Sequence, residues 1–295
     1  MKNNEKFQRG LEALGIQLNE IQLQQFEDYY RILIEWNKVM NLTAITEYDE
    51  VITKHFLDSL SIVKLCDVSR ETLKKNNIEI SNFEIISAAS DQGAGNVHEM
   101  KKSENVNDFM QTENKKSQPV CKLNKKKLLD LGTGAGFPGI PLKIAFPSLD
   151  IVLMDSLNKR INFLNEVIQQ LSLKDILAIH GRAEEFGRKE EFRERYNCCV
   201  SRAVAKLVSL SEYCLPFVKK GGYFIPYKSA RSEEEFVEAK YAIGQFGGKY
   251  VRQVSFLLPE SDAERTLFLI QKVKETPGKY PRGGGKPTNQ PLLAK

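Results

Sequence analysis

Residues 127–155 hold two short apolar runs separated by a glycine-rich turn and a helical stretch, and the second run ends in Asp155. Gly132, Gly134 and Gly136 allow the backbone to turn sharply and to approach a ligand closely. Strand, glycine turn, helix, strand and acidic residue, in this order, are typical of folds that bind an adenosine-containing molecule, and the acidic side chain accepts hydrogen bonds from the ribose. The segment predicts a Rossmann-like α/β unit in which Gly132, Gly134 and Asp155 bind the cofactor.

The glycines fit two cofactors. Gly134, Gly136 and Gly139 match the dinucleotide pattern G-x-G-x-x-G, whereas Gly132, Gly134 and Gly136 match the tighter pattern G-x-G-x-G. A nicotinamide dinucleotide would bring its pyrophosphate near the carboxylate of Asp130, at a cost of roughly one to a few kcal/mol. S-adenosylmethionine has no phosphate, and its ammonium and sulfonium groups are cations. We therefore expect S-adenosylmethionine; the alternatives are a nicotinamide dinucleotide and a glycine turn that only packs a helix on a sheet.

The composition excludes several classes of protein. Of the 295 residues, 27% are charged and 41% hydrophobic, and no apolar run approaches the roughly 18 residues that span a membrane. The N-terminal segment MKNNEKFQRG has no apolar stretch of the signal-peptide type, so we expect a cytoplasmic protein without a membrane partner. Separately, we expect a monomer. The five cysteines form no C-x-x-C pair and the three histidines have no helical metal-site spacing, so we predict no metal.

Hydrophobic patterning divides the chain into four regions. Residues 1–68 contain two amphipathic helices and predict an N-terminal helical cap. Residues 69–126 are rich in Asn, Lys, Ser and Glu and predict a mostly disordered insertion. Residues 127–274 form the predicted S-adenosylmethionine-binding domain. Residues 275–295 are rich in glycine, proline and basic residues and predict a flexible tail, either an arm for phosphates or a solubilising segment.

Strands and helices alternate regularly after residue 127. We predict a helix over residues 156–171, with Ser156 as its cap. Seven strands are expected, near residues 128–131, 150–155, 176–180, 197–202, 222–227, 250–258 and 266–273. Helical stretches separate the first five, which predicts a mostly parallel, doubly wound sheet. Its ligand should lie over the carboxyl ends of the strands, where the glycine turn, Asp155, residues 181–184 and Arg202 meet.

The sequence also limits the acceptor of a methyl group. A nucleophilic lone pair that attacks a sulfonium carbon needs orientation and desolvation rather than a base. Enzymes that methylate exocyclic amines generally carry an Asn/Asp-Pro-Pro-aromatic turn after the fourth strand, but residues 201–207 read SRAVAKL. Methylation of a pyrimidine carbon needs a thiolate, and Cys198 and Cys199 lie in an apolar strand, where burial raises a thiol pKa. These observations are compatible with a purine ring nitrogen as the methyl acceptor, and we expect no catalytic base.

Eight segments closely resemble the bacterial glucose-inhibited division protein B family, the small-subunit ribosomal RNA guanine-N7 methyltransferases. In chain order they are WNKVMNLTAIT (36–46), HFLDSL (55–60), DLGTGAGFPGIPL (130–142), DSLNKRINFL (155–164), GRAEEFG (181–187), SRAVAKL (201–207), EYCLPFVKKGG (212–222) and KYPRGGGKP (279–287). The resemblance implies a class I S-adenosylmethionine-dependent methyltransferase that acts on N7 of a guanine in 16S rRNA, guanine 527 in the family, with the small ribosomal subunit as partner. N7 bears a free lone pair on the major-groove edge, so no base is needed.

The resemblance also implies cofactor contacts. It carries them over to Gly132, Phe137, Ala183, Glu184 and Arg202. Ala183 and Glu184 would meet the adenine, and Arg202 would orient the methionine carboxylate. The alternative, purely structural roles are that Phe137 is an aromatic residue of the hydrophobic core and that Glu184 is an acidic residue in the first turn of a helix.

Cations near the site and in the tail are the candidates for RNA binding. Lys159 and Arg160 lie at the start of a predicted helix, where a cation interacts unfavourably with the helix dipole. Their presence there suggests that they bind an anion from another molecule, such as an RNA phosphate. The predicted set is Lys159, Arg160, Arg182, Lys279 and Arg282, and the alternative is solvated surface charge. A methyltransferase of a small molecule or protein would not use these cations, whereas a non-catalytic RNA-binding module with the same fold would use them without methyl transfer.

Two further expectations concern the cap. Trp36, Asn37 and Asn41 are expected to fix the cap onto the sheet. His55 and Asp58 are expected to form a structural hydrogen-bond pair rather than a catalytic dyad.

Overall fold

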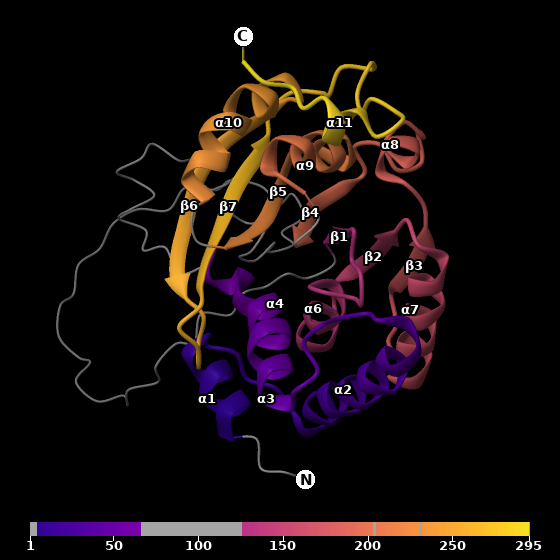
Figure 1. Cartoon of the computed structure of the whole chain (residues 1–295), viewed down its shortest axis with the longest axis vertical. Coiled ribbons are helices and arrows are strands. Elements are labelled where there is room, and N and C mark those ends of the chain that lie inside the picture. Colours follow the sequence, from indigo (N-terminus) through magenta and orange to yellow (C-terminus); the bar gives the residue numbers. More distant parts are fainter. Residues whose placement is uncertain (1–4, 66–125, 203–204, 230–231, 295) are drawn as a thin grey trace, which may run out of the picture.

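A seven-stranded sheet forms the centre of the molecule (Figure 1). The computed structural model describes residues 5–65, 126–202, 205–229 and 232–294, so the predicted insertion lies almost wholly outside the described residues. The strands are β1 (Lys127–Leu131), β2 (Asp150–Asp155), β3 (Ile176–His180), β4 (Tyr196–Arg202), β5 (Val218–Ser229), β6 (Gly248–Leu257) and β7 (Glu264–Lys272). Their order is β3-β2-β1-β4-β5-β7-β6, with β7 antiparallel to β5 and β6. The predicted fold class, a mostly parallel seven-stranded α/β sheet, is confirmed.

Helices cover both faces of the sheet. The cap and its connections comprise α1 (Glu5–Ala13), α2 (Glu20–Met40), α3 (Tyr48–Val51), the π-helix η1 (Ile52–Leu57), α4 (Asp58–Leu60) and η2 (Ser61–Leu65). The remaining helices are α6 (Gly139–Ala145), α7 (Asn158–Gln170), α8 (Ala183–Phe186), α9 (Leu207–Cys214), η4 (Leu215–Phe217), α10 (Ser232–Gln245) and α11 (Lys286–Asn289). In Figure 1 the cap lies beside α6 and α7, whereas α8 to α11 lie across the sheet from it.

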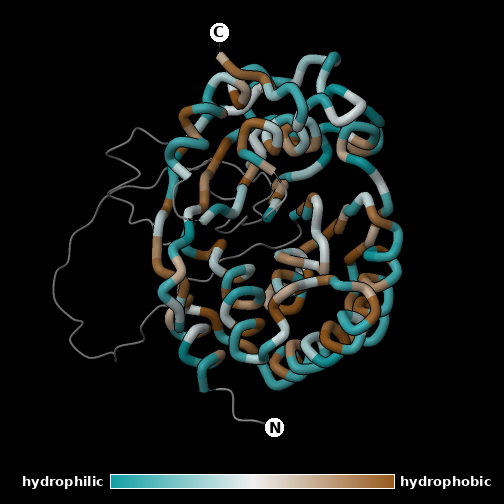
Figure 2. The backbone as a smooth tube through the Cα atoms, viewed as in Figure 1, coloured by the Kyte–Doolittle hydropathy of each residue, from teal (hydrophilic) through white to brown (hydrophobic). Residues whose placement is uncertain are grey.

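Alternating strand residues produce two separate cores. Leu128 packs with the cap and α6, whereas its neighbour Leu129 packs with α9 and α10, because successive side chains of a strand point to opposite faces. Figure 2 shows hydrophobic residues within the strands and hydrophilic residues along the outer turns of the helices. The central strands are therefore buried on both sides, as in most parallel sheets, whereas the edge strands β3 and β6 are only partly buried.

The cap contacts the sheet layer through α2. Asn19 and Gln22 form a capping box at the start of this helix, and the Gln22 amide also donates to the Ile144 carbonyl over 2.7 Å. Trp36 packs edge-on against Phe163 of α7, with 5.8 Å between ring centroids. Asn37 instead bonds to the backbone of Thr43 within the cap, so its expected contact with the sheet layer is not observed.

Asp58 ties the cap to the sheet by two ion pairs. Its carboxylate accepts from Arg202 of β4 and Arg265 of β7, each over 2.9 Å, and its side chain is only 5% exposed. The His55 ring bonds to Thr43 and Arg202, whereas its contact with Asp58 is only between the backbone N–H of Asp58 and the His55 carbonyl. The expected His55–Asp58 pair is therefore wrong, because two arginines from distant strands occupy the carboxylate.

The tail is packed against the domain rather than flexible, which corrects the expectation from its composition. Tyr280 is 5% exposed and packs edge-on against Phe246, with 4.8 Å between ring centroids. Arg188 donates to the carbonyls of Lys279 and Pro281, each over 2.9 Å. Glycine and proline do not build a core, but donors from a distant segment fix the tail backbone.

Replacing Asp58 tests how the cap is held. Asp58→Asn is expected to lower the free energy of unfolding by about 2–4 kcal/mol, because it leaves two largely buried guanidinium groups without a carboxylate. Glu260→Gln is the control: it breaks the Arg9–Glu260 pair, in which Arg9 is 56% exposed, and should cost less than about 1 kcal/mol. Urea unfolding measures both, and equal losses would contradict the anchoring role.

Candidate active site

The glycine loop joins β1 to α6 in a backbone conformation that favours glycine. Gly132, Gly134 and Gly136 have φ angles of 70°, 62° and 94°. A Cβ on Gly136 would come within 2.8 Å of the Tyr29 hydroxyl, whereas a Cβ on Gly134 would meet no atom within 4 Å among the described residues. The loop is thus tightly packed at Gly136 and open at Gly134, where a ligand can approach the backbone.

Asp130 lies buried under this loop. Its Oδ2 accepts from the Thr133 hydroxyl over 2.6 Å and from the Gly139 backbone N–H over 2.8 Å. Its Oδ1 is buried and has no hydrogen-bond partner within the described part of the chain. Burial is the main cause that raises the pKa of Asp130 to about 6. The loop therefore rests on a carboxyl group with one unused acceptor, which suits a cationic ligand above it better than a phosphate.

Asp155 connects the glycine loop to α7. Its Oδ2 accepts from the Gly134 N–H over 3.0 Å, and its Oδ1 accepts from the Leu157 N–H over 2.9 Å. Arg160 pairs with the same carboxylate at 3.1 Å. Two predictions change as a result. The N-cap of α7 is Leu157, without a side-chain cap bond, so Ser156 is not the cap, and Arg160 is an ion-pair partner rather than a free cation for RNA.

A pocket of about 290 Å³ opens beside the loop. Six separate stretches of chain line it, and they bring together the predicted Gly132, Asp155, Ala183 and Glu184. The complete lining is Leu131, Gly132, Met154, Asp155, Ser156, Gly181, Arg182, Ala183, Glu184, Ala205, Tyr213, Gly285 and Thr288. Tyr213, Gly285 and Thr288 were missed, since no periodicity or motif spacing relates the tail to this pocket.

Phe137 and Arg202 meet beside the pocket rather than in its lining. The Arg202 guanidinium lies 5.1 Å from the Phe137 ring centroid. The His55 ring stacks on the same Phe137 ring, with 4.4 Å between the two centroids. Arg202 also donates to the Lys54 carbonyl over 3.1 Å. Burial and Arg202 lower the pKa of His55 to about 3, so it is a neutral acceptor at neutral pH. This cluster couples the π-helix to the glycine loop, and short π segments are frequent near functional sites.

The cysteines of β4 are buried, as expected. Burial raises the pKa of both the Cys198 and the Cys199 thiol, so neither is a ready thiolate. Among the described residues, no group of His, Cys, Asp and Glu could hold a metal ion. In that same part of the chain, no helix is both long and apolar enough to cross a membrane.

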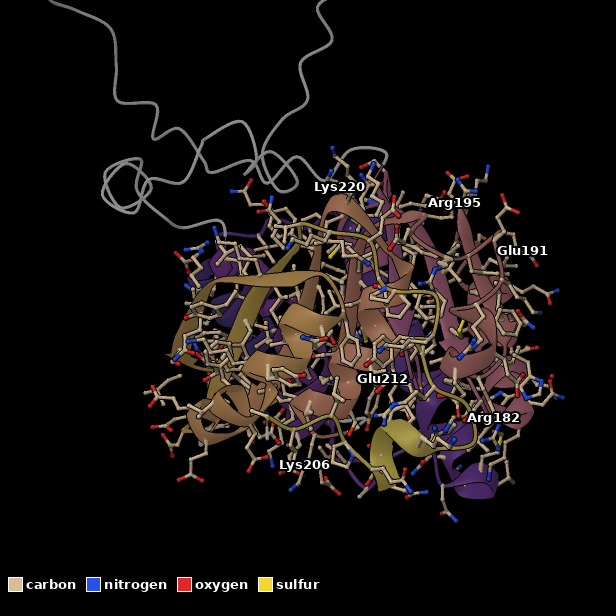
Figure 3. All side chains as sticks on the ribbon, turned by 90° about the horizontal axis from the view of Figure 1, so that it is seen from above. Arg182, Glu191, Arg195, Lys206, Glu212 and Lys220 are labelled. Carbon is tan, nitrogen blue, oxygen red and sulfur yellow. The ribbon has the colours of Figure 1, made fainter. Side chains whose placement is uncertain are left out.

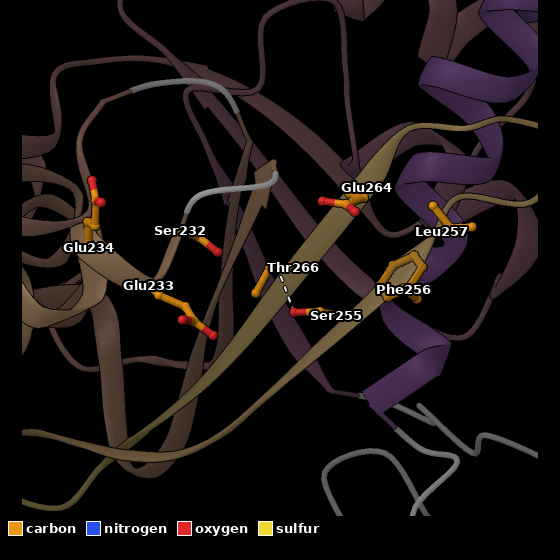
Figure 4. Close-up of a pocket in the computed structure, with 8 residues that line it drawn as sticks. All are labelled: Ser232, Glu233, Glu234, Ser255, Phe256, Leu257, Glu264 and Thr266. Carbon is orange, nitrogen blue, oxygen red and sulfur yellow. Dashed lines mark hydrogen bonds between the residues drawn. The ribbon is translucent and has the colours of Figure 1, made fainter.

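A second cavity, of about 490 Å³, contains none of the predicted site residues (Figure 4). It is lined by the start of α10 and by β6 and β7, and the Ser255 and Thr266 hydroxyls are 2.9 Å apart in it. Glu233, Glu234 and Glu264 surround it. It lies apart from the glycine loop and from every predicted cofactor residue, so the glycine-loop pocket is the better candidate site.

Comparisons with known proteins match this architecture. The family model for GidB, rRNA small subunit methyltransferase G, matches residues 22–78 and 94–268. A ribosomal RNA small subunit methyltransferase G from Lachnoclostridium phytofermentans is 52% identical, with all of both chains covered. One from Alkaliphilus metalliredigens is 43% identical over 96% of each chain. The solved structure of TrmN from Thermus thermophilus has a TM-score of 0.41 and 16% identity, over 51% of this chain and 45% of that one.

Fold, loop and pocket together with these matches define an rRNA methyltransferase. The chain belongs to the rRNA small subunit methyltransferase G (GidB) family, and the resemblance read from its eight segments is confirmed.

The pH dependence of stability tests the burial of Asp130. Its pKa is raised from 3.8 to about 6 on folding, so the folded state binds the proton more tightly and stability is lost as pH rises through this range. Asp130→Asn removes the effect. From about pH 4 to about pH 7, wild-type stability should therefore fall by about 2–3 kcal/mol relative to Asp130→Asn. Urea unfolding across this range measures it, and a constant difference would contradict the raised pKa.

Proposed function

We propose that the protein transfers a methyl group from S-adenosylmethionine to N7 of a guanine in 16S rRNA, guanine 527 of the family. Membership of the family supports rRNA as the substrate. The observation that supports this cofactor is the pair of carboxyl groups at the glycine loop: Glu184 lines the pocket, and Asp130 lies under the loop with its Oδ1 unpartnered among the described residues. Carboxylates stabilise an ammonium and a sulfonium and disfavour a pyrophosphate.

Each predicted cofactor residue has a proposed role. When bound, the cofactor supplies an electrophilic methyl group on its sulfonium. Gly132 offers backbone atoms to it from the pocket lining. Gly134 lies outside the lining with its N–H bonded to Asp155, and only its carbonyl is proposed to face the cofactor; Ala183 and Glu184 meet the adenine. Asp155 both fixes the Gly134 N–H and faces the pocket, which supports ribose binding. Phe137 and Arg202 are proposed to shape the methionine end from beside the pocket, with Arg202 held in place by Asp58.

The reaction as proposed needs no proton acceptor in the pocket. A purine N7 carries a free lone pair, so alignment with the methyl carbon and exclusion of water are the contributions that the protein makes. Among the described residues, the pocket lining contains no histidine or cysteine. Methylation of N7 also leaves a cationic purine, which the neighbouring carboxylates would stabilise.

We infer that RNA approaches over the exposed cations around the pocket. Arg182 lines the pocket, Lys206 follows the pocket residue Ala205, and Lys286 follows the pocket residue Gly285; all three cations are exposed. Figure 3 shows Arg182 and Lys206 on either side of α11. Neither Lys206 nor Lys286 was among the cations predicted from the sequence. The proximity of Lys286 to the pocket depends on the packed tail, and that of Lys206 on the segment between β4 and α9.

The other predicted RNA contacts divide into two groups. Lys159 and Lys279 are exposed and stay proposed contacts. Arg160 and Arg282 are each bonded to a buried carboxylate, Arg160 to Asp155 and Arg282 to Glu212. A cation already neutralised in this way gains less from a phosphate, so we withdraw these two.

Mapping the modified nucleotide tests the proposed reaction. Small subunits from cells that lack the gene are incubated with the purified protein and S-adenosylmethionine, and 7-methylguanine is located by borohydride and aniline strand scission. We expect one cleavage in 16S rRNA that requires both protein and cofactor. Methyl incorporation only into protein or a small molecule would support the alternative methyltransferase. Ribosome binding without any methyl product would support the non-catalytic module.

Salt dependence tests the RNA-facing cations. Replacing Arg182, Lys206 and Lys286 together with Gln should reduce the slope of log affinity against log salt by about two, since each phosphate contact with single-stranded RNA contributes about 0.7. A matched triple Gln variant at the exposed Lys219, Lys220 and Lys240 keeps the net charge equal. In Figure 3, Lys220 lies on the opposite side of the molecule from Lys206. Equal slopes for the two variants would contradict this surface.

A further inference from the structure

The C-terminal tail forms one wall of the glycine-loop pocket. Gly285 and Thr288 belong to its lining. The Thr288 hydroxyl lies 3.0 Å from the Tyr213 hydroxyl of α9, and Tyr213 lines the pocket as well. The side of the pocket formed by the tail therefore depends on how residues 282–290 are held.

One ion pair fixes this segment. The Arg282 guanidinium donates to both carboxylate oxygens of Glu212, with 2.7 Å between Nη2 and Oε2 and 2.9 Å between Nε and Oε1. The Arg282 backbone N–H also donates to Glu212, over 2.7 Å. Glu212 is 1% exposed and directly precedes Tyr213 in α9. Such bidentate, charge-assisted pairs combine strength with fixed geometry.

The same arginine closes the segment into a loop. Its Nη2 donates to the Gln290 carbonyl over 2.9 Å, so Arg282 holds both ends of residues 282–290. Within this loop, Gly284 and Gly285 adopt φ angles of 67° and 69°, which turn the chain into α11. Thr288 is brought to the pocket by this turn.

A second set of contacts holds the chain just before the loop. Arg193 donates to the Tyr280 and Gly187 carbonyls, over 2.9 and 2.8 Å. A Cβ on Gly187 would lie 3.1 Å from Pro281, so the two segments are in close contact. Gly187 directly follows α8, which carries Ala183 and Glu184. The tail thus bridges the two helices, α8 and α9, that form opposite parts of the pocket.

We propose that residues 282–290 are a strap that completes the cofactor pocket, and that Arg282 is a positioning residue that holds the strap through Glu212. The inference rests on the proposed function, because it takes this pocket to be the cofactor site. Without the Arg282 side chain, the buried Glu212 carboxylate keeps only the backbone N–H of residue 282, and the strap loses the bond that holds the Gln290 carbonyl. Cofactor affinity falls although no group that touches the reacting atoms has changed.

Reciprocity gives a second consequence. If the docked strap strengthens cofactor binding, a bound cofactor must stabilise the docked strap by the same factor. A ligand that fits this pocket therefore protects the strap from local opening, and from cleavage that requires opening.

Calorimetric titration with S-adenosylhomocysteine tests the positioning role. Arg282→Gln should weaken binding about tenfold, and Arg282→Lys, which keeps the charge but not the bidentate geometry, should recover part of the loss. Arg9→Gln is the matched control, because the Arg9–Glu260 pair has the same 2.7 Å length but joins α1 to the turn between β6 and β7, and α1 lies far from α11 of the strap (Figure 1). Its affinity should stay within twofold of the wild type. In methylation assays, the KM for the cofactor should rise for Arg282→Gln while kcat changes little.

Limited trypsin digestion of the wild type keeps the proposal testable if Arg282→Gln does not fold. Saturating S-adenosylhomocysteine should slow cleavage after Arg282 several-fold more than cleavage after Arg9. Equal protection at the two sites, or wild-type affinity in Arg282→Gln, would overturn the strap alone. Failure of the wild type to bind S-adenosylhomocysteine would overturn the proposed cofactor, and the strap with it.

Discussion

The buried carboxyl group of Asp130 is the constraint on which the site depends. It bonds to Thr133 at the start of the glycine loop and to Gly139 at the start of α6, so it fixes both ends of the turn. Gly139 has no space for a side chain, because a Cβ there would lie 2.2 Å from Leu153. The same carboxyl group keeps one oxygen without a partner among the described residues. One residue thus sets the shape of the loop and the charge that a ligand meets.

Buried carboxylates that hold arginines recur around this loop. They connect the loop to α7, the cap to the sheet, and the tail to α9; the pairs are Asp155–Arg160, Asp58–Arg202 and Glu212–Arg282. Each pair joins a separate part of the chain to the region around the pocket. Because a buried carboxylate is costly without its partner, each arginine is needed for local structure before it is available for a ligand. This explains why arginines that look like RNA or cofactor contacts in the sequence have structural roles.

Local patterns in the sequence predicted the sheet well, and distant contacts less well. Apolar runs and glycines mark β1 to β7 and the loop, because strands and tight turns are determined by nearby residues. The packed tail was not predicted, since its composition resembles a flexible linker and its partner Glu212 is 70 residues away from Arg282. The Asp58–Arg202 pair was not predicted either, because its two residues are 144 positions apart in the sequence. Within the site, Gly132, Asp155, Ala183 and Glu184 were brought together as expected, whereas the wall from the tail was missed.

The central claim is that the carboxylates at the glycine loop select a cationic methyl donor over a polyanionic dinucleotide. Calorimetric titration of the full chain with S-adenosylmethionine and, separately, with NADH in the same buffer tests it most directly. The account predicts that S-adenosylmethionine binds at least about tenfold more tightly, the ratio that corresponds to an electrostatic difference of about 1.4 kcal/mol. Equal affinity, or tighter binding of NADH, would contradict it.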